Sequence, residues 1–540
     1  MTEEGHKPES FEVKHLDPDE VETSVAKAST WSRLKAQLIG TQPCTRHHYI
    51  VFVLSWTSWA MFHASRKAIS TVKTSIKEQW MPPELACETI GWNNRSSVCI
   101  GQDEFYREDN FRNTFAGASN FLGVLDGTYE TVYALGLYFA GFLGDRFEQR
   151  KVLASGMLGC GIGMLIFGTL TEWFHFYDSL FYVVIWGITG FTQSCGYPAE
   201  MSIMGKWFSR STRGALMGLW ATCVNIGNVA GAWVGAELLH YGYEYVFLVN
   251  ACYMMFGSIV LYFGLVSEPV HIGLPNPHAK EEEEETSYFV PEDPSQPGSS
   301  TKPFKTRPPP ISFAKALMLP GVISCSLAYF GIKLINYCFF FWLPFYLTHR
   351  YGWHEATSDR LSTFYDWGGI SSFFLGLMTD KFHSRIPTII VLMLVDTVAM
   401  YVYSGLPADM VLNSIVMLVM GAMAGGASNL MSTAVCMDLG HTPDLEGNEE
   451  ALATVTGIVD GTGSMGAAVG QLFLPLLMNW MGWDAVFYMF IFFGLFTVVC
   501  LLPMLYIDTR QWLADKRKAR DNERQPLKDV GPPGAYPYTY

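Results

Sequence analysis

Residues 141–170 read GFLGDRFEQRKVLASGMLGCGIGMLIFGTL, and two kinds of sequence meet within them. The first eleven residues hold five charged side chains, whereas the nineteen residues from Val152 to Leu170 hold none. A run of about 20 apolar residues is long enough to cross a bilayer as a helix. The stretch therefore predicts a charged turn at a membrane surface, followed by a membrane-spanning helix.

Similar apolar runs recur along the chain, as in Val246–Val266, Ile389–Leu406 and Val486–Leu502. By the same criterion they predict an all-α membrane protein with twelve transmembrane helices. The predicted spans are 47–76, 119–144, 151–171, 178–205, 214–236, 245–267, 318–347, 358–380, 386–405, 409–437, 451–478 and 485–507.

The composition agrees with this fold class and excludes several others. Of the 540 residues, 49% are hydrophobic and 16% are charged, against about 25% charged in soluble globular proteins. The chain is too apolar for disorder, has no collagen-like glycine period, and has too few cysteines, 11, for a disulfide scaffold. Its first 45 residues are polar and lack the apolar core of a removable signal peptide, so the first span is expected to stay as an anchor.

Charge is distributed unevenly between the predicted spans and their connections. Lys and Arg cluster after spans 2, 4, 8 and 12 and are missing after spans 3, 5, 9 and 11, which predicts that both termini are cytosolic. The formal net charge of −14 argues against a nucleic-acid partner. It does not oppose an anionic ligand within the membrane, because the acidic excess falls in 1–45, 78–118, 268–311 and 438–450.

The 78–118 loop offers a check on this topology, which places the loop outside the cytosol. It contains the glycosylation triplet Asn94-Arg95-Ser96 between Cys87 and Cys99. We interpret it as a glycosylated, disulfide-closed lumenal or extracellular loop. The alternative is a chance triplet beside unpaired cysteines, because cysteine pairing cannot be read from sequence.

Residues 268–317 interrupt the apolar pattern with five consecutive glutamates and a run of prolines. Such a segment predicts a disordered cytosolic linker, and it divides the spans six and six. The predicted organisation is an N-terminal cytosolic tail (1–46), a first six-helix bundle (47–267), the linker (268–317), a second six-helix bundle (318–507) and a C-terminal cytosolic tail (508–540).

Two motifs recur in the two halves at matching places. The charged turn formed by Gly141, Asp145, Arg146 and Arg150 returns 235 residues later as Gly376, Asp380, Lys381 and Arg385. The glycines Gly218, Gly227 and Gly231 return 239 residues later as Gly457, Gly466 and Gly470. A solvated charged turn would not by itself recur in this way, so the pattern indicates that one six-span unit has been duplicated.

The repeated Gly-x-x-x-Asp-Arg/Lys turn in two six-helix halves resembles the major facilitator superfamily, over nearly all of residues 47–507. The resemblance implies two pseudo-symmetric bundles that rock about a central cavity, with the charged turns as conformational gates. One departure is that Glu148 and His383 stand where the family usually has glycine.

One nucleotide-binding pattern can be set aside. Residues 461–466, GTGSMG, match G-x-G-x-x-G, and Asp484 follows at a suitable distance. No strand precedes them, and they lie within the 451–478 span, where small residues permit close helix packing. No zinc, nucleophile-elbow or P-loop pattern is found, so we expect no enzyme activity, no metal and no cofactor.

Charged residues within spans are functional candidates, because each costs about 2.5 to 3.5 kcal/mol at the centre of a membrane helix. Lys333 is the only charged residue between Pro320 and Leu347, and it is too deep to reach the interface easily. The functional interpretation is a ligand-binding or coupling lysine, and the alternative is an internal ion pair with a carboxylate.

Arg66 and Lys67 follow a 16-residue apolar run, so the pair could anchor the helix at the membrane interface. The uncharged continuation from Ala68 to Val72 favours a place in the cavity instead. Three cations from the first helix of each half indicate an anionic substrate with concentrated charge. Arginine can bind phosphate bidentately, and lysine supplies a point charge.

Other polar residues within the spans have both functional and structural interpretations. His63, one turn before Lys67, is either a substrate contact or a packed side chain, and Glu200, after Pro198, either lines the cavity or caps a kink. The carboxylates of span residues could hold the cations when the site is empty, carry a proton, or form structural ion pairs. These carboxylates are Asp366, Asp396 and Asp460.

Residues 62–70, FHASRKAIS, look like the first helix of the organophosphate/phosphate antiporters, particularly the animal sugar-phosphate exchangers of solute carrier family 37. Further matches are GKWF at 205–208, WLP at 342–344, DWGGI at 366–370 and DGTGSMG at 460–466. The resemblance implies exchange of a phosphorylated sugar, typically glucose 6-phosphate, for inorganic phosphate across the endoplasmic reticulum membrane. It also implies that Arg66 and Lys67 bind the phosphate.

The chain departs from this family at several places, one of which is Ala68, where a proline is common. Ala221 and Val224 replace an asparagine and a histidine of its signature, so the phosphate-binding role of that histidine in bacterial members cannot apply. The basic residue of span 7 in bacterial members falls at Asn336, three positions after Lys333. Because three residues make almost one helical turn, we expect Lys333 and Asn336 on the same face, both at the substrate site.

The sequence therefore predicts a sugar-phosphate antiporter whose partners are phosphorylated sugar, inorganic phosphate and the lipid bilayer. One alternative is a proton-coupled organic-anion symporter of the same fold, with Asp366 or Asp460 as the proton carrier. Another is a non-transporting sensor or scaffold that signals through the acidic linker.

Overall fold

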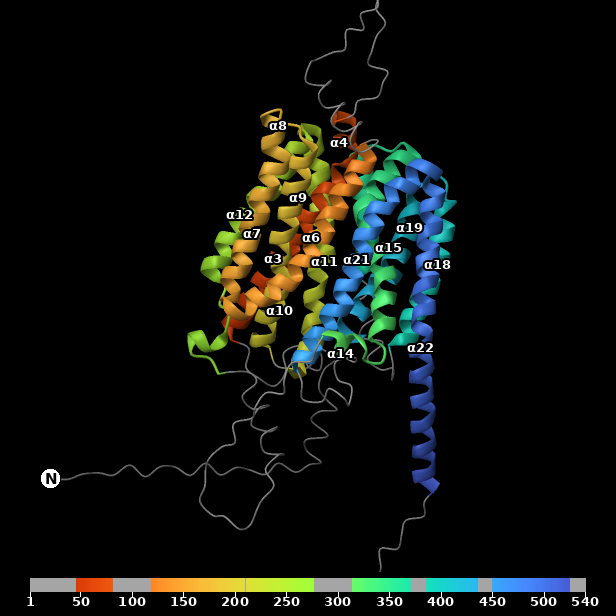
Figure 1. Cartoon of the computed structure of the whole chain (residues 1–540). Helices are drawn as coiled ribbons and strands as arrows, with labels where there is room; N and C mark the ends of the chain where they lie inside the picture. The colour runs from red at the N-terminus through yellow and green to blue at the C-terminus, as the bar shows by residue number, and fades with distance from the viewer. Residues whose placement is uncertain are drawn as a thin grey trace, which may run out of the picture.

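The computed structural model describes residues 45–80, 118–208, 210–275, 313–370, 385–435 and 449–524. Within these ranges every regular element is a helix and no strand forms. The helices run side by side, with the first half of the chain on one side and the second half on the other (Figure 1). The predicted all-α membrane fold of two helical bundles is confirmed.

The described part of each predicted span falls on one helix or on consecutive helical segments. The first half contains α3 (Arg46–Thr71), α4 (Lys73–Trp80), α6 (Ala118–Arg146), α7 (Gln149–Met164), η2 (Leu165–Leu170), α8 (Thr171–Trp173), α9 (Ser179–Ser194), α10 (Gly196–Trp207), α11 (Arg210–Leu238), η3 (Leu239–Tyr241), α12 (Tyr243–Gly264) and η4 (Pro269–Ile272). The second half contains α14 (Phe313–Leu317), α15 (Val322–Tyr351), α16 (Glu355–Ile370), α18 (Ile386–Ser404), α19 (Met410–Asn429), η5 (Leu430–Val435), α21 (Glu449–Met481) and α22 (Trp483–Arg524).

Within the described ranges, a turn residue interrupts the helix in two of the predicted spans. The first breaks at Val72, between α3 and α4, and the fourth breaks at Cys195, between α9 and α10. The second break lies three residues before Pro198, which has no N–H to bond to the turn before it.

The repeated glycines make the same kind of contact in both halves. A Cβ added to Gly227 would lie 2.3 Å from the carbonyl oxygen of Ala60, and one added to Gly466 would lie 2.2 Å from that of Phe330. Thus α11 packs on α3 in the first half as α21 packs on α15 in the second. These contacts confirm the helix-packing interpretation of residues 461–466.

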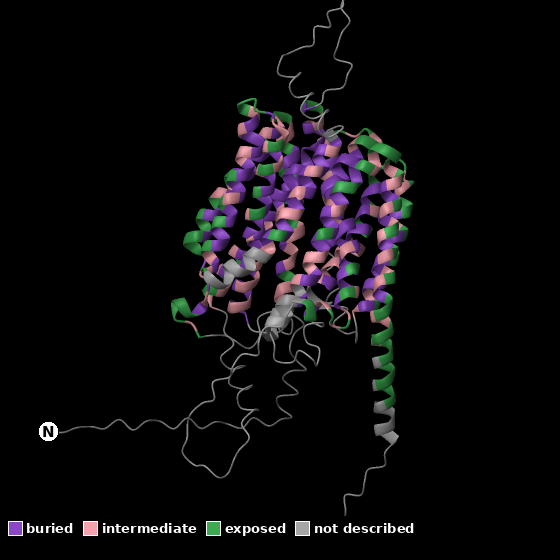
Figure 2. Cartoon of the chain, in the orientation of Figure 1, coloured by how far each residue is buried: buried purple, intermediate pink, exposed green. Residues whose placement is uncertain are grey.

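The outer surface of the bundle is apolar. Figure 2 shows buried residues between the helices and exposed residues on their outward faces. Large exposed side chains include Phe263, Tyr401 and Phe492, and a continuous apolar surface of this kind needs a lipid environment. Within the described residues, six helices are long and apolar enough to cross a membrane: Gln149–Trp173, Tyr243–Gly264, Val322–Tyr351, Ile386–Ser404, Met410–Ser432 and Trp483–Ala514.

The structure adds detail to the last predicted span and to the ends of the predicted linker, and it leaves other predictions untested. Helix α22 continues to Arg524, beyond the predicted end of its span at residue 507, and the short helices η4 and α14 lie within the predicted linker. The remainder of the linker (276–312) lies outside the described residues, as do Asn94, Cys87 and Cys99. The domain boundaries therefore stay a prediction.

Candidate functional site

The bundle has two ends, each marked by short helices or helix extensions. The α4 end holds α4 and α8, and the α14 end holds α14 and the extension of α22 (Figure 1). The topology predicted from the sequence assigns the α4 end to the lumen and the α14 end to the cytosol.

Arg66 of α3 is buried, with 3% of its surface exposed, among side chains of α6, α9 and α15. Its Nε donates a hydrogen bond to Gln193 Oε1 at 2.9 Å, and its Nη1 donates to the Tyr337 hydroxyl at 3.3 Å. Nη1 also lies 3.8 Å from Glu130 Oε1. The guanidinium carbon lies 4.5 Å from the ring centroid of Tyr133. Arg66 is therefore an interior cation and not an interfacial anchor.

Lys333 of α15 is held by α21. Its Nζ donates to Asp460 Oδ1 at 2.9 Å and to Ser464 Oγ at 3.1 Å, and it lies 5.0 Å from the ring centroid of Tyr329. The lysine is buried, while the Asp460 side chain keeps 23% of its surface exposed. The ion pair foreseen for Lys333 is present, and its carboxylate remains partly accessible.

Arg66 and Lys333 lie at one interface between the two halves. The Tyr337 hydroxyl, which accepts from Arg66 Nη1 at 3.3 Å, belongs to α15 and comes about one helical turn after Lys333. Because α6 and α3 belong to the first half and α15 to the second, the site lies between the two bundles. It combines two cations with the carboxylates of Glu130 and Asp460, an arrangement that compensates the positive charge before an anion binds.

Lys67 points toward the second half of the chain. Its Nζ donates to the Phe340 carbonyl oxygen at 3.0 Å and lies 3.8 Å from Asp366 Oδ2. Asn228 Nδ2 donates to Asp366 Oδ1 at 2.8 Å, and the His63 ring nitrogen Nδ1 lies 3.3 Å from Asn228 Oδ1. Lys67, Asp366 and His63 thus belong to one polar network that joins α3, α11 and α16.

Asn336 has different neighbours from Lys333. Its Nδ2 donates to the Ile332 and Ala424 carbonyl oxygens at 3.3 and 3.2 Å, and its Oδ1 accepts from the Tyr365 hydroxyl at 2.7 Å. These contacts direct the amide toward α16 and α19, whereas Lys333 contacts α21. In this conformation Asn336 connects helices of the second half to one another.

Glu200 and Asp396 are buried carboxylates without an ion pair among the described residues. Glu200 accepts hydrogen bonds from Ser55 at 2.5 Å and from Ser58, and Trp220 Nε1 donates to Ser55 at 2.9 Å. Glu200 therefore ties α10 to α3. In the part of the chain that the structure describes, neither oxygen of Asp396 has a hydrogen-bond partner.

The charged turn of the first half is anchored by Glu148 and Arg150. Glu148 precedes α7, and its carboxylate pairs with Arg150 at 2.7 Å and with Lys151 at 3.2 Å. A carboxylate at a helix N-terminus is favourable, which explains how the turn accommodates Glu148 where glycine is usual. Gly141, Asp145 and Arg146 end α6, and Arg385 precedes α18. Gly376, Asp380 and Lys381 lie outside the described residues.

Several buried charged residues were not predicted as functional candidates from the sequence. Lys73 and Asp126 form an ion pair in which both side chains are fully buried, and Glu130 lies beside Arg66. Asp359 of α16 is also fully buried, and neither of its oxygens has a hydrogen-bond partner within the described ranges. All of them lie inside predicted spans, so the criterion that selected Lys333 would have found them.

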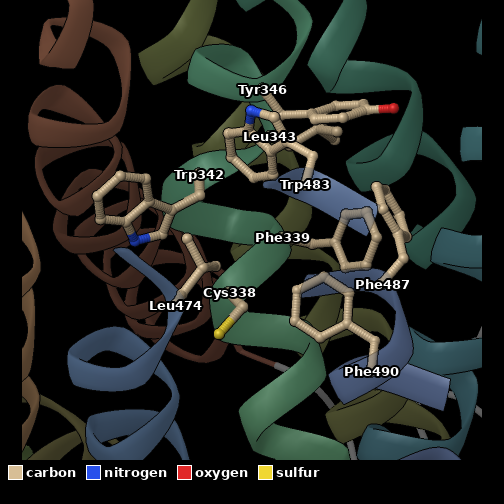
Figure 3. Close-up of a pocket in the computed structure, with 9 residues that line it drawn as sticks. All are labelled: Cys338, Phe339, Trp342, Leu343, Tyr346, Leu474, Trp483, Phe487 and Phe490. Atoms are coloured by element: carbon tan, nitrogen blue, oxygen red, sulfur yellow. The ribbon is translucent and has the colours of Figure 1, made fainter. Parts of the chain in front are cut away.

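A small pocket in the second half is unsuited to an anion. It lies between α15, α21 and α22 and is lined by nine uncharged residues (Figure 3). They are Cys338, Phe339, Trp342, Leu343, Tyr346, Leu474, Trp483, Phe487 and Phe490. A search of the described residues for groups of His, Cys, Asp and Glu that could hold a metal ion finds none.

Known proteins resemble the chain in both sequence and fold. Residues 91–443 match the Major Facilitator Superfamily. Sugar phosphate exchanger 3 of Xenopus laevis is 41% identical over 488 residues, covering 88% of this chain and 95% of that protein. Putative glycerol-3-phosphate transporter 5 of Arabidopsis thaliana is 34% identical over 470 residues, covering 84% and 91%. A crystal structure of a D-xylose-proton symporter matches with a TM-score of 0.59 at 12% identity, covering 84% of this chain and 97% of that one.

Fold and buried charges together define a multi-pass integral membrane transporter. The chain belongs to the major facilitator superfamily and, within it, to the sugar-phosphate exchangers of solute carrier family 37.

Proposed function

We propose that the chain exchanges a phosphorylated sugar for inorganic phosphate across a membrane by alternating access. The observation that carries this proposal is the contact of Arg66, on the first helix of the first half, with Tyr337, which comes about one turn after Lys333 on the first helix of the second half. The names of the relatives, sugar phosphate exchanger and glycerol-3-phosphate transporter, support a phosphorylated substrate.

The contacts of Arg66 suit a phosphate ligand. At 3.8 Å, its ion pair with Glu130 is too long for a hydrogen bond. A phosphate can therefore accept two hydrogen bonds from the guanidinium while Glu130 remains nearby as a negative charge. Lys333 adds point charge from the opposite bundle, and Lys67 adds charge from the neighbouring network. One anion would then bind both halves.

Exchange, as opposed to net transport, follows from the charge of the site. An empty site with buried cations moves slowly between conformations, because partly compensated charges must cross a low-dielectric interior. A bound phosphate lowers this cost, and so does a phosphate ester. Binding on either side would thus accelerate reorientation in both directions.

We propose glucose 6-phosphate as the sugar phosphate and the endoplasmic reticulum membrane as the location, with both termini in the cytosol. Side chains suited to sugar hydroxyls surround the cations. Gln193, Tyr337 and Ser464 contact Arg66 or Lys333 directly. Ring faces of Tyr129 and Tyr133 lie beside Arg66.

Reconstituted protein tests the proposal. Liposomes loaded with inorganic phosphate should take up labelled glucose 6-phosphate, and liposomes without internal phosphate should not. Arg66→Ala and Lys333→Ala should each abolish the uptake. Lys315→Ala is the matched control, because Lys315 is an exposed lysine of α14. Unchanged uptake in the Arg66 and Lys333 variants would refute the assignment of the site.

A second candidate is a proton-coupled organic-anion symporter of the same fold. It is favoured by Asp396, a buried carboxylate whose oxygens have no hydrogen-bond partner among the described residues. Such a group is suited to carry a proton. This candidate predicts uptake that is driven by a pH gradient and needs no internal phosphate.

A further inference from the structure

Among the described residues, hydrogen bonds and an ion pair join the two halves at the α4 end. Ser75 donates to Glu355 through its backbone N–H at 3.0 Å and through its hydroxyl at 2.5 Å, and Asn479 Nδ2 donates to Asn120 Oδ1 at 2.8 Å. Arg360 pairs with Glu237. All these residues lie near helix ends on this side, so the conformation is one in which the α4 end is closed.

A row of cations on α3 and α4 faces a row of aromatic rings on α15. The Nζ atom of Lys67 lies 4.6 Å from the ring centroid of Phe340. Toward the α4 end, the Nζ atom of Lys77 lies 5.3 Å from the ring centroid of Phe345. Between them, the Nζ atom of Lys73 lies 3.8 Å from the ring centroid of Trp342, and this is the shortest of the three distances. Each contact joins the first helix of one half to the first helix of the other.

The contact between Lys73 and Trp342 differs from its neighbours in how its partners are held. Lys73 is fully buried and paired with Asp126 of α6, in its own half. Trp342 Nε1 donates to Gln471 Oε1 of α21 at 2.8 Å, also within its own half. In Figure 3 the Trp342 indole points away from Phe339, Phe487 and Phe490, toward the helices of the first half drawn in faint red-brown.

We propose that the contact of Lys73 with the Trp342 ring is a latch that stabilises the conformation closed at the α4 end. Lys73 and Trp342 would position the two halves without touching the substrate. This inference rests on the alternating-access part of the proposed function and not on the identity of the substrate.

The way each partner is held makes such a latch reversible. When the halves separate, Lys73 keeps its carboxylate and Trp342 keeps its amide partner, so neither is left as an unpaired buried group. What is lost is the attraction between a desolvated ammonium and an indole face. By contrast, the Lys67–Asp366 ion pair joins the two halves and loses a charged partner on opening.

Distance measurements between spin labels can test the latch. Phe174 follows α8, Met481 ends α21, and both are exposed at the α4 end, one in each half. Cysteines at these two positions, in a background without other accessible cysteines, would carry nitroxide labels. Double electron–electron resonance on the full chain in nanodiscs, without substrate, then reports the ratio of open to closed molecules at this end.

Trp342→Leu should raise the ratio of open to closed molecules about fivefold, as expected for the loss of a desolvated cation–π contact. Trp342→Phe is the matched control, because it also loses the hydrogen bond to Gln471 but keeps a ring face. It should change the ratio less than about twofold. The double variant Lys73→Met/Asp126→Asn removes the cation without leaving a lone buried carboxylate, and it should behave like Trp342→Leu.

The proposal is overturned if Trp342→Leu keeps the distance distribution of the parent, or if Trp342→Phe opens the α4 end as much as Trp342→Leu does. Should Trp342→Leu fail to fold, the Lys73→Met/Asp126→Asn variant decides, and an unchanged distribution there also overturns the latch. These results are independent of which anion is transported, because no substrate is present in the measurement.

Discussion

The first helices of the two halves occupy equivalent places in the two bundles but carry different chemistry. Helices α3 and α4 present cations, Arg66, Lys67, Lys73 and Lys77, whereas α15 presents Lys333 and the rings of Tyr337, Phe340, Trp342 and Phe345. The cations of one helix contact the rings of the other. The two equivalent helices are therefore chemically complementary.

The interior ion pairs of these helices are of two kinds, those within one half and those between the halves. Arg66–Glu130, Lys73–Asp126 and Lys333–Asp460 each lie within one half, whereas Lys67–Asp366 joins the halves. Pairs within a half can persist while rigid bundles rock against each other. A pair between halves must break at each opening, so its strength affects the balance between conformations.

The largest effect is expected from the ion pair of α15. Lys333→Met leaves the Asp460 carboxylate without its cation, which should lower the free energy of unfolding by about 3 to 5 kcal/mol. Lys333→Met/Asp460→Asn should regain most of that loss, because no lone charge remains. Thermal unfolding of the purified variants gives the comparison.

Neither variant should exchange phosphate. If the double variant regained exchange together with stability, Lys333 would serve only to satisfy Asp460 and would have no part in binding.

The glycine contacts test whether the two first helices are packed in equivalent ways. Gly227→Ala and Gly466→Ala should each cost about 1 to 3 kcal/mol, because the new methyl group meets a backbone carbonyl oxygen of α3 or α15. Gly457→Ala is the matched control, since no atom lies within 4 Å of its added Cβ. It should be neutral or slightly stabilising. Equal unfolding temperatures for Gly466→Ala and Gly457→Ala would contradict this packing.

The pair between halves should influence conformation more than stability. Asp366→Asn weakens its attraction to Lys67 and should raise the ratio of open to closed molecules at the α4 end about fivefold, which corresponds to ~1 kcal/mol. Asp460→Asn, within one half, should leave that ratio near the parent value. The labels at positions 174 and 481 provide the measurement. Equal ratios for the two variants would remove the distinction between the two kinds of pair.

The smallest effect is expected at the α14 end of the first half. Lys206 and Glu268 pair at 2.6 Å on a partly exposed surface, and the hydrogen bond from Lys206 lowers the pKa of Glu268 below its ordinary value of 4.5. The pair therefore stabilises the fold above the ordinary pKa, and this contribution is lost as the pH falls through the lowered pKa. Glu268→Gln should cost less than about 1 kcal/mol at pH 7. Thermal unfolding of the parent and of Glu268→Gln at pH 7 and pH 4 is the measurement, and the cost of the substitution should be smaller at pH 4. A larger cost, or one that does not change with pH, would contradict this role of the pair.

Much of the fold was predictable because apolar length and the internal repeat are local properties of the sequence. The same holds for Arg66 and Lys333, which stand out as charges in apolar runs. Asp460 was among the carboxylates expected to hold the cations, but its pairing with Lys333, like that of Glu130 with Arg66, follows only from the packing of distant helices. Asn336 shows why spacing alone is insufficient. Three residues rotate a helix position by about 300°, which was enough to give Asn336 and Lys333 different neighbouring helices.

Lys73 could have been found from the sequence, since it lies inside the first predicted span. Its role could not, because the break at Val72 and the contact with Trp342 are tertiary features. Likewise, the sequence places Lys67 beside Arg66 but does not show that Arg66 pairs with a carboxylate of its own half, Glu130, whereas Lys67 pairs with Asp366 of the other half.

Equilibrium binding of labelled inorganic phosphate to purified protein tests the central claim most directly. If Arg66 and Lys333 bind one phosphate, Arg66→Met and Lys333→Met should each weaken binding by about 100-fold, as expected for a lost charge-assisted contact. The double variant should lose less than the product of the two single losses, because the cations share one ligand. Phosphate affinity that stays at the parent value in both single variants would contradict the account.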